Sequence, residues 1–136
     1  MNIIQTDYPV AVSKQLAAII SHELEASGID TFSGQGFILN FRDPDYSAES
    51  GGYHPVEIAV DGQGRIQYIT DFAYVGDGHY AELDKELDFD FSYGKFQQMG
   101  KEYPIQQGAS LYKIWQANFC SYYQSQVFQV TVQSRA

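Results

Sequence analysis

The chain lacks several features that define large classes of protein. Its 136 residues contain one cysteine, which excludes an internal disulfide framework. They contain no apolar run of the roughly 18 residues that a membrane-spanning helix needs. Lysine and arginine total 8 against 17 acidic residues, so the formal charge of −9 argues against nucleic-acid binding. The first residues lack the basic and apolar segments of a secretion signal, so we expect a cytoplasmic protein with no membrane partner.

What the chain does contain is typical of a globular protein. Its length suits one compact domain, so we predict a single domain over residues 1–136. Charged residues make up 18% of the chain, below the roughly 25% of an average domain, which argues against disorder. Aromatic residues make up 15%, including 11 tyrosines and 9 phenylalanines, enough to supply much of a core. The aromatic residues expected in the core lie on one face of the predicted sheet and on the last predicted helix: Tyr68, Phe72, Tyr74, Phe89, Phe91, Tyr93, Tyr112, Trp115, Phe119 and Tyr122. Because tyrosine is amphipathic, some of them could instead line a wet groove or a protein contact.

Two segments are expected to be helices. Leu16, Ile20 and Leu24 recur every four residues in the segment 10–27, and Gly28 follows as a helix-ending residue. Apolar residues also fall at helical spacing in the segment 107–124.

Five segments are expected to be strands: 37–42, 53–60, 66–75, 86–93 and 127–132. Gly62 to Gly64 separate two of them and predict a hairpin loop with Gly64 in the left-handed conformation. The predicted register pairs Val60 with Ile66, Ile58 with Tyr68 and Val56 with Thr70, which puts these apolar residues on one face. The order is α-β-β-β-β-α-β. We therefore predict a two-layer α+β domain, with an antiparallel sheet of about five strands and two helices packed on one face.

The negative charge is concentrated in residues 71–90, which carry seven acidic side chains and one basic side chain, Lys85. If Phe72 pairs with Phe89 in neighbouring strands, Asp71 lies opposite Asp90, with Asp88 nearby. Like charges that face each other on a sheet are unfavourable, and a basic partner surface or a cation would relieve them. A different register, or neutralisation by Arg42 or Lys85, would remove the conflict without any partner.

Two histidines lie in glycine- and tyrosine-containing connections and provide an alternative site. His54 follows Gly51, Gly52 and Tyr53, while His79 follows Asp77. Histidine changes charge near neutral pH, so His54, Asp77 and His79 could serve acid–base chemistry or hold a small molecule or cation. Two distant histidines are more often ordinary loop residues.

No catalytic, metal or cofactor motif is complete. Ser92 to Lys95 and Ser110 to Lys113 each match Ser-x-x-Lys without its companion motifs. Residues 43–49 have the alternating oxygen ligands of a calcium loop but lack its glycine, so they are interpreted as a turn. Cys120 lies in the second half of a predicted helix, where the dipole disfavours a thiolate, so we expect a packing residue. We predict no catalytic residues, metal or cofactor, and favour a protein that is not an enzyme.

Three segments carry a resemblance to a known family: Tyr74 to Gly78, Leu87 to Phe91, and Leu111 to Phe119. Together they resemble a small family of bacterial proteins catalogued as a domain of unknown function, over nearly the whole chain. The resemblance implies a bacterial, cytosolic protein of one domain and implies no chemistry.

Two functions remain open from the sequence. The first is a non-enzymatic binding or regulatory module that contacts a partner protein through Asp71, Asp88 and Asp90. The second is a small-molecule or cation-binding domain that uses the loops of His54, Asp77 and His79. A homodimer joined through an uncovered strand edge is a further possibility.

Overall fold

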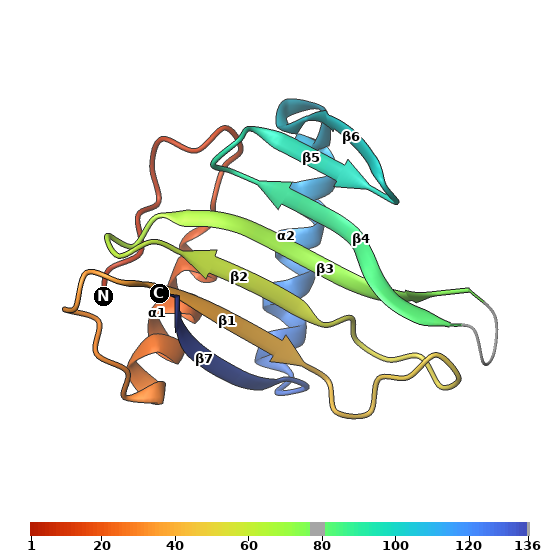
Figure 1. Cartoon of the computed structure of the whole chain (residues 1–136), viewed down its shortest axis with the longest axis horizontal. Helices are drawn as coiled ribbons and strands as arrows, with labels where there is room; N and C mark the ends of the chain where they lie inside the picture. The colour runs from red at the N-terminus through yellow and green to blue at the C-terminus, as the bar shows by residue number, and fades with distance from the viewer. Residues whose placement is uncertain (77–80, 136) are drawn as a thin grey trace.

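The computed structural model describes residues 1–76 and 81–135, which form one seven-stranded sheet and two α-helices (Figure 1). Paired strands are antiparallel, in the order β6-β5-β4-β3-β2-β1-β7. The elements in chain order are α1 (Lys14–Ser27), β1 (Gly36–Arg42), β2 (Val56–Val60), β3 (Ile66–Val75), β4 (Glu82–Asp90), β5 (Lys95–Gln98), β6 (Lys101–Pro104), the 3₁₀ helix η2 (Ile105–Gly108), α2 (Ala109–Gln124) and β7 (Gln129–Arg135).

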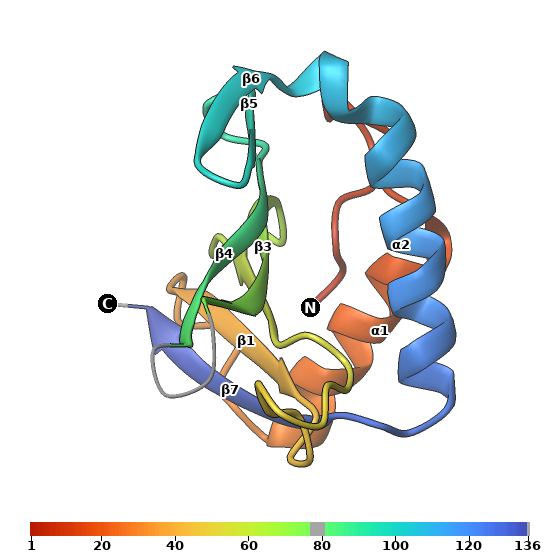
Figure 2. The same cartoon turned by 90° about the vertical axis from the view of Figure 1, so that its right-hand side faces the viewer.

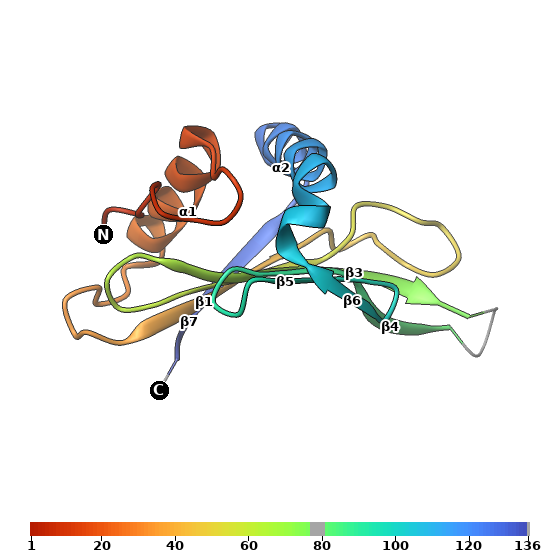
Figure 3. The same ribbon diagram turned by 90° about the horizontal axis from the view of Figure 1, so that it is seen from above.

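Both α-helices cover the same face of the sheet, and no described helix covers the opposite face, here called the outer face (Figures 2 and 3). This arrangement confirms the predicted α+β class, with an antiparallel sheet and two helices. The predicted number of about five strands is wrong. The missed strands, β5 and β6, have four residues each, too few to show a period-two pattern.

The first helix begins later than its apolar spacing suggests. Ser13 is the N-cap, and its hydroxyl oxygen accepts a hydrogen bond from the Leu16 amide. The helix therefore starts at Lys14, four residues after the predicted start at residue 10. It ends as predicted at Gly28, whose φ of 72° is easy for glycine. Neither α-helix is both long and apolar enough to cross a membrane.

The β2–β3 hairpin has the predicted loop but a different register. The Asp61 amide donates to the Arg65 carbonyl, Gly64 has a φ of 90°, and Val60 pairs with Ile66 as expected. Beyond that pair a β-bulge shifts the register by one residue. As a result Val56 pairs with Asp71 rather than with Thr70.

The predicted register between β3 and β4 is also wrong. Asp71 pairs with Leu87, and Thr70 pairs with Asp88. Since neighbouring side chains of a strand point to opposite faces, Asp71 lies beneath the helices while Asp88 and Asp90 lie on the outer face. The three aspartates therefore do not share one acidic surface, and the predicted conflict between Asp71 and Asp90 does not arise.

A second bulge changes the direction of one β4 side chain. Asp71 pairs with Leu87 and Phe72 pairs with Lys85, so Glu86 between them has no partner residue on β3. A bulge inserts one extra residue and redirects its side chain. Strict alternation would place Glu86 on the outer face, but the bulge allows it to reach the helix side.

The bulges also divide the aromatic residues, which simple alternation assigns to one face. Phe89, Phe91 and Phe96 are buried in the core. Phe89 and Phe91 contact Tyr112 of α2, and Phe89 also contacts Trp115. Tyr68 and Phe72 instead line a groove on the outer face, and Tyr93 is 80% exposed. The predicted core positions are therefore confirmed for Phe89 and Phe91 and for Tyr112, Trp115 and Phe119 of α2. Tyr74, Tyr93 and Tyr122 are exposed instead.

Candidate functional site

The site begins with the loop of residues 43–55, which carries His54. The Asp43 carboxylate organises this loop by accepting hydrogen bonds from the amides of Asp45 (2.9 Å) and Tyr53 (3.0 Å). A Cβ at Gly52 would lie 2.8 Å from Asp43 Oδ2, so glycine permits this close approach. The Tyr46 amide donates to the Asp43 carbonyl, which confirms the predicted turn in the calcium-loop-like segment.

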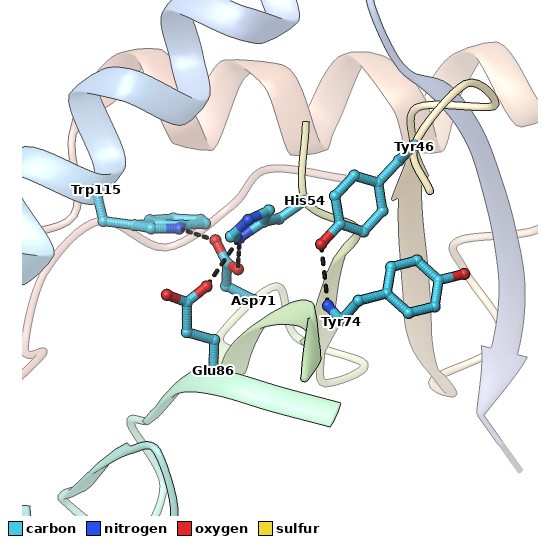
Figure 4. Close-up of polar contacts among 6 residues, drawn as sticks. All are labelled: Tyr46, His54, Asp71, Tyr74, Glu86 and Trp115. Carbon is cyan, nitrogen blue, oxygen red and sulfur yellow. Dashed lines mark hydrogen bonds and ion pairs between the residues drawn. The ribbon is translucent and has the colours of Figure 1, made fainter. Parts of the chain in front are cut away.

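Tyr46 ties the loop to β3. Its hydroxyl oxygen accepts a hydrogen bond of 3.0 Å from the Tyr74 amide, and its ring stacks on the Tyr74 ring. The same Tyr46 ring lies 5.5 Å from the His54 ring, centre to centre (Figure 4). These contacts limit the positions that His54 can take.

Three ionisable side chains meet at the end of this loop, and we call them the carboxylate–histidine cluster: His54, Asp71 and Glu86. His54 Nδ1 lies 2.8 Å from Asp71 Oδ1 and 2.9 Å from Glu86 Oε2 (Figure 4). They come from the β1–β2 loop, β3 and β4. The two bulges described above are what place the carboxylates on the same side of the sheet as the histidine.

Asp71 is the buried centre of this cluster, with only 7% of the residue exposed. Its second carboxylate oxygen, Oδ2, accepts a hydrogen bond of 2.8 Å from the indole Nε1–H of Trp115 on α2 (Figure 4). A buried carboxylate is costly unless hydrogen-bonded and paired, and Asp71 has both kinds of partner. Trp115 and Asp71 together therefore hold the orientation of the imidazole.

The cluster shifts the protonation equilibrium of His54. The hydrogen bond to Asp71 raises the pKa of the imidazole above its ordinary value, partial burial opposes the rise, and the charges of Asp71 and Glu86 add to it. The protonated form is therefore favoured. In that form Nε2, which has no hydrogen-bond partner among the described residues, carries a hydrogen that it can donate.

Next to the cluster lies a cavity of about 300 Å³, which we call the aromatic pocket. Its walls come from the 43–55 loop, β2, β3, α2 and the segment before β7. The lining residues are Gly52, Tyr53, His54, Val56, Asp71, Trp115, Asn118, Phe119, Tyr122 and Phe128. An apolar cavity with a few converging polar groups is the usual form of a small-molecule site.

The structure rearranges the residues selected from the sequence. His54 and Asp71 were assigned to different candidate sites, and the fold brings them into direct contact. Asp88 and Asp90 lie away from them on the outer face. Asp77 and His79 lie outside the described residues.

Two residues of the site were missed. Glu86 was only one of seven acids in a charged segment, and nothing in the local pattern marks it as the bulged residue. Trp115 was assigned to the core, where its ring does pack, but its N–H also needs an acceptor. A buried indole N–H usually finds a hydrogen-bond partner. This requirement is the one feature of the sequence that could have indicated a polar partner for Trp115.

The outer face holds a second, more polar groove. It contains Asp88, Lys85 and Thr70, and the Thr70 hydroxyl donates a hydrogen bond of 2.8 Å to Asp88. Lys85 Nζ lies 4.0 Å from the Asp88 carboxylate. A lysine side chain is therefore close to the acidic residues of this groove, in agreement with the alternative that Lys85 neutralises them. Burial raises the pKa of the Asp88 carboxyl, and Thr70 and Lys85 oppose the rise.

The single cysteine, Cys120, is not accessible from either the aromatic pocket or the groove on the outer face. Cys120 is buried in α2, and burial raises the pKa of its thiol. A thiol with a raised pKa is a poor nucleophile. The prediction of a packing residue is confirmed.

Comparison with known proteins identifies the family. A family model described as "Protein of unknown function (DUF2787)" matches residues 14–133. The chain belongs to this family. No curated protein matches this member of the DUF2787 family. The predicted resemblance to a family of unknown function is thereby confirmed.

Two solved structures are similar to this DUF2787 protein. The hypothetical protein VC0508 from the VSP-II pathogenicity island of Vibrio cholerae is 36% identical, with a TM-score of 0.82, over 96% of this chain and 99% of that one. The conserved hypothetical protein VC1805 from pathogenicity island VPI-2 of V. cholerae is 35% identical, with a TM-score of 0.79, over 94% and 98%. VC1805 is described as sharing structural homology with the human P32 protein. Both relatives are bacterial, in keeping with the origin expected from the sequence.

Proposed function

We propose that this DUF2787 protein binds a small organic molecule in the aromatic pocket, with His54 as the polar anchor. The observation that carries the proposal is the placement of His54. Its Nδ1 is held by Asp71, Asp71 is held by Trp115, and the imidazole lines a cavity whose other walls are largely aromatic. A rigid polar group at the wall of an apolar pocket fixes the orientation of a ligand.

The lining indicates the chemistry of the ligand. Five of the ten lining residues are aromatic, namely Tyr53, Trp115, Phe119, Tyr122 and Phe128, and such a lining suits a flat ring system. His54 Nε2–H and the Asn118 amide can donate hydrogen bonds to an acceptor such as a carbonyl oxygen. The two carboxylates near His54 disfavour an anion, because they outnumber the single imidazolium. The favoured ligand is therefore a neutral ring compound with a hydrogen-bond acceptor, of about fragment size, since 300 Å³ is small for a ligand site.

A thermal-shift screen of neutral ring compounds tests this proposal. A ligand at about 100 times its Kd stabilises the protein by about 2.7 kcal/mol, which raises Tm by several degrees. Tyr122→Ala, in the pocket wall, should abolish the shift. Tyr93→Ala is the matched control, because Tyr93 is an exposed tyrosine on the other side of the sheet and should leave the shift unchanged. A screen without hits, or hits that survive Tyr122→Ala, would overturn the proposal.

Contact with a partner protein through the outer face is a second candidate. The observation in its favour is that no described helix covers this face, which carries Asp88, Asp90 and the 80% exposed Tyr93. The test is affinity purification from cells that express the protein, with wild type, the double variant Asp88→Asn/Asp90→Asn and the control Asp84→Asn. A partner lost with the double variant alone supports this surface, and unchanged recovery removes it.

The proposed homodimer has one suitable strand edge. Of the two edge strands, β6 has four residues and contains Lys101 and Pro104, which hinder pairing. β7 is seven residues long and alternates half-buried with exposed residues up to Thr131 and Val132. Light scattering after size exclusion measures the mass, and a mass of one chain would remove this dimer.

A further inference from the structure

We propose that the carboxylate–histidine cluster is a binding site for a divalent first-row transition-metal ion, with His54 Nδ1, Asp71 and Glu86 as the ligands. This inference goes beyond the organic ligand of the aromatic pocket and does not depend on it. It rests on the convergence of three ligand atoms from three different parts of the chain, all within 4.8 Å of one another.

The first support is the number of acceptors around one nitrogen. An imidazole nitrogen carries at most one hydrogen, yet Nδ1 faces two carboxylate oxygens at 2.8 and 2.9 Å. A single hydrogen cannot point at both oxygens, so one of the two contacts is always poorly aligned. A cation in place of that hydrogen would bind all three groups at once.

The second support is the spacing of the ligand atoms. Ligands about 2.1 Å from an ion lie about 3.0 Å apart at the right angles of an octahedron and about 3.4 Å apart in a tetrahedron. The two separations from His54 Nδ1, 2.8 and 2.9 Å, are close to the octahedral value, and all three ligand atoms lie within 4.8 Å of one another. Small movements of the His54 and Glu86 side chains would therefore admit a six-coordinate ion.

The third support is the surroundings of the ligands. Metal-binding carboxylates are usually held by further hydrogen bonds, and the Trp115 indole N–H supplies one to the Asp71 oxygen that does not face His54. The His54 and Glu86 side chains are 37% and 35% exposed, which leaves room for water molecules at the remaining positions. Asp71 would therefore be a fixed ligand, and the ion would be open to solvent on the side of His54 and Glu86.

The ligand set also indicates which ions fit. Two carboxylates with one imidazole combine the hard oxygen donors that Mg²⁺ and Mn²⁺ prefer with the nitrogen donor that favours Co²⁺, Ni²⁺ and Zn²⁺. Affinity should therefore rise from Mn²⁺ through Co²⁺ to Ni²⁺, and Mg²⁺ should bind much more weakly.

Isothermal titration of the chelator-treated full chain with Co²⁺, Ni²⁺, Zn²⁺, Mn²⁺ and Mg²⁺ tests the site. We expect one transition-metal ion per chain and at least a tenfold loss of affinity in Glu86→Gln. Glu82→Gln is the matched control, since Glu82 is an exposed glutamate of the same strand and should bind as wild type does. His54→Gln is a second variant that should also weaken binding, and the Tm of each metal-free variant verifies folding.

Line broadening by Mn²⁺ in the amide spectrum locates the ion. Broadening centred on residues 53–55, 71–72 and 85–87 supports the proposal. Absence of binding, binding that Glu86→Gln leaves unchanged, or broadening centred on the outer face would overturn it.

The same variants separate this inference from the proposed function. Glu86 does not line the aromatic pocket, so Glu86→Gln should lose the metal and keep the organic ligand. Tyr122→Ala should lose the organic ligand and keep the metal. If each variant loses only one of the two ligands, the metal and the organic compound bind at separate sites. The two proposals can therefore be supported or overturned independently of each other.

Discussion

At the scale of single residues, Asp71 links the strands, the loop and α2. It accepts hydrogen bonds from His54 and from the Trp115 indole, and it is almost fully buried. Replacement by alanine would leave the buried Trp115 N–H without an acceptor and release His54. We expect Asp71→Ala to lower the free energy of unfolding by about 1–3 kcal/mol, measured by urea denaturation.

The control for this prediction is Asp84→Ala, which removes an exposed carboxylate from β4. Surface substitutions of that kind usually change stability by less than about 0.5 kcal/mol. Equal losses in the two variants would show that Asp71 has no special structural role.

The ionisation of Asp88 should make the stability of the protein depend on pH. Burial raises the pKa of its carboxyl, so the folded protein keeps this proton to a higher pH than the unfolded chain does. The stabilisation is present below the ordinary pKa of about 4 and is lost as the pH rises through the folded-state pKa. Asparagine keeps an acceptor for Thr70 and does not ionise, so Asp88→Asn should gain stability relative to wild type from pH 4 upward.

Urea denaturation from pH 3 to pH 7 measures that difference. The exposed Asp84→Asn serves as the control, and its stability should run parallel to that of wild type. A constant offset between Asp88→Asn and wild type across this range would contradict the prediction.

At the scale of the elements, a buried glutamine joins α2 to the start of α1. Gln116 Oε1 accepts hydrogen bonds from the Ser13 amide (2.9 Å) and from the Tyr112 hydroxyl (2.8 Å). Gln116→Leu fills a similar volume and leaves both donors unpaired. We expect a loss of about 1–3 kcal/mol in unfolding free energy. Gln124→Leu, at an exposed position of the same helix, should cost far less.

Much of the order of helices and strands could be predicted from the sequence. The register in which β2, β3 and β4 pair could not. Period-two alternation and glycine placement located β1, the β2–β3 hairpin and the second half of β4, because those signals are local. The predicted strand 86–93 begins four residues after the true start of β4 at Glu82 and runs past its end at Asp90. The bulges after Val60 and at Glu86 depend on how neighbouring strands pair, and no local pattern encodes them. A shift of one residue moves a side chain to the other face. For this reason Asp71 was grouped with Asp88 rather than with His54.

The site was predictable only in pieces. His54 was selected because histidine titrates near neutral pH, and Asp71 because it lies in an acidic segment. Their contact depends on the path of the 43–55 loop, which Asp43 and Tyr46 fix through hydrogen bonds to distant backbone groups. Contacts between residues 17 or more positions apart, as between His54 and Asp71, are set by the whole fold.

At the scale of the whole molecule, stability should be uneven across the sheet. β2 and β3 lie in the middle of the sheet and carry fully buried residues such as Ile58 and Ile69. β5 and β6 form a hairpin of four-residue strands at one edge, and most of their residues are at least partly exposed. Strands at an exposed edge open more easily than central ones.

Hydrogen exchange followed by mass spectrometry measures this gradient. Amides of residues 95–104 should exchange faster than those of residues 56–71, apart from turn residues, by at least tenfold. Equal protection of the two segments would contradict the prediction and would indicate that the edge hairpin opens only with the whole domain.

The central claim is that His54, fixed by Asp71 and Trp115, presents a polar group to an aromatic binding pocket. An amide-spectrum titration of the wild-type protein with a set of neutral ring fragments that carry a carbonyl acceptor tests it most directly. The account predicts saturable shifts confined to residues 52–56, Asp71, residues 115–122 and Phe128, together with a shift of the His54 ring signals. Shifts centred on the outer face, or no saturable shift from any fragment, would contradict it.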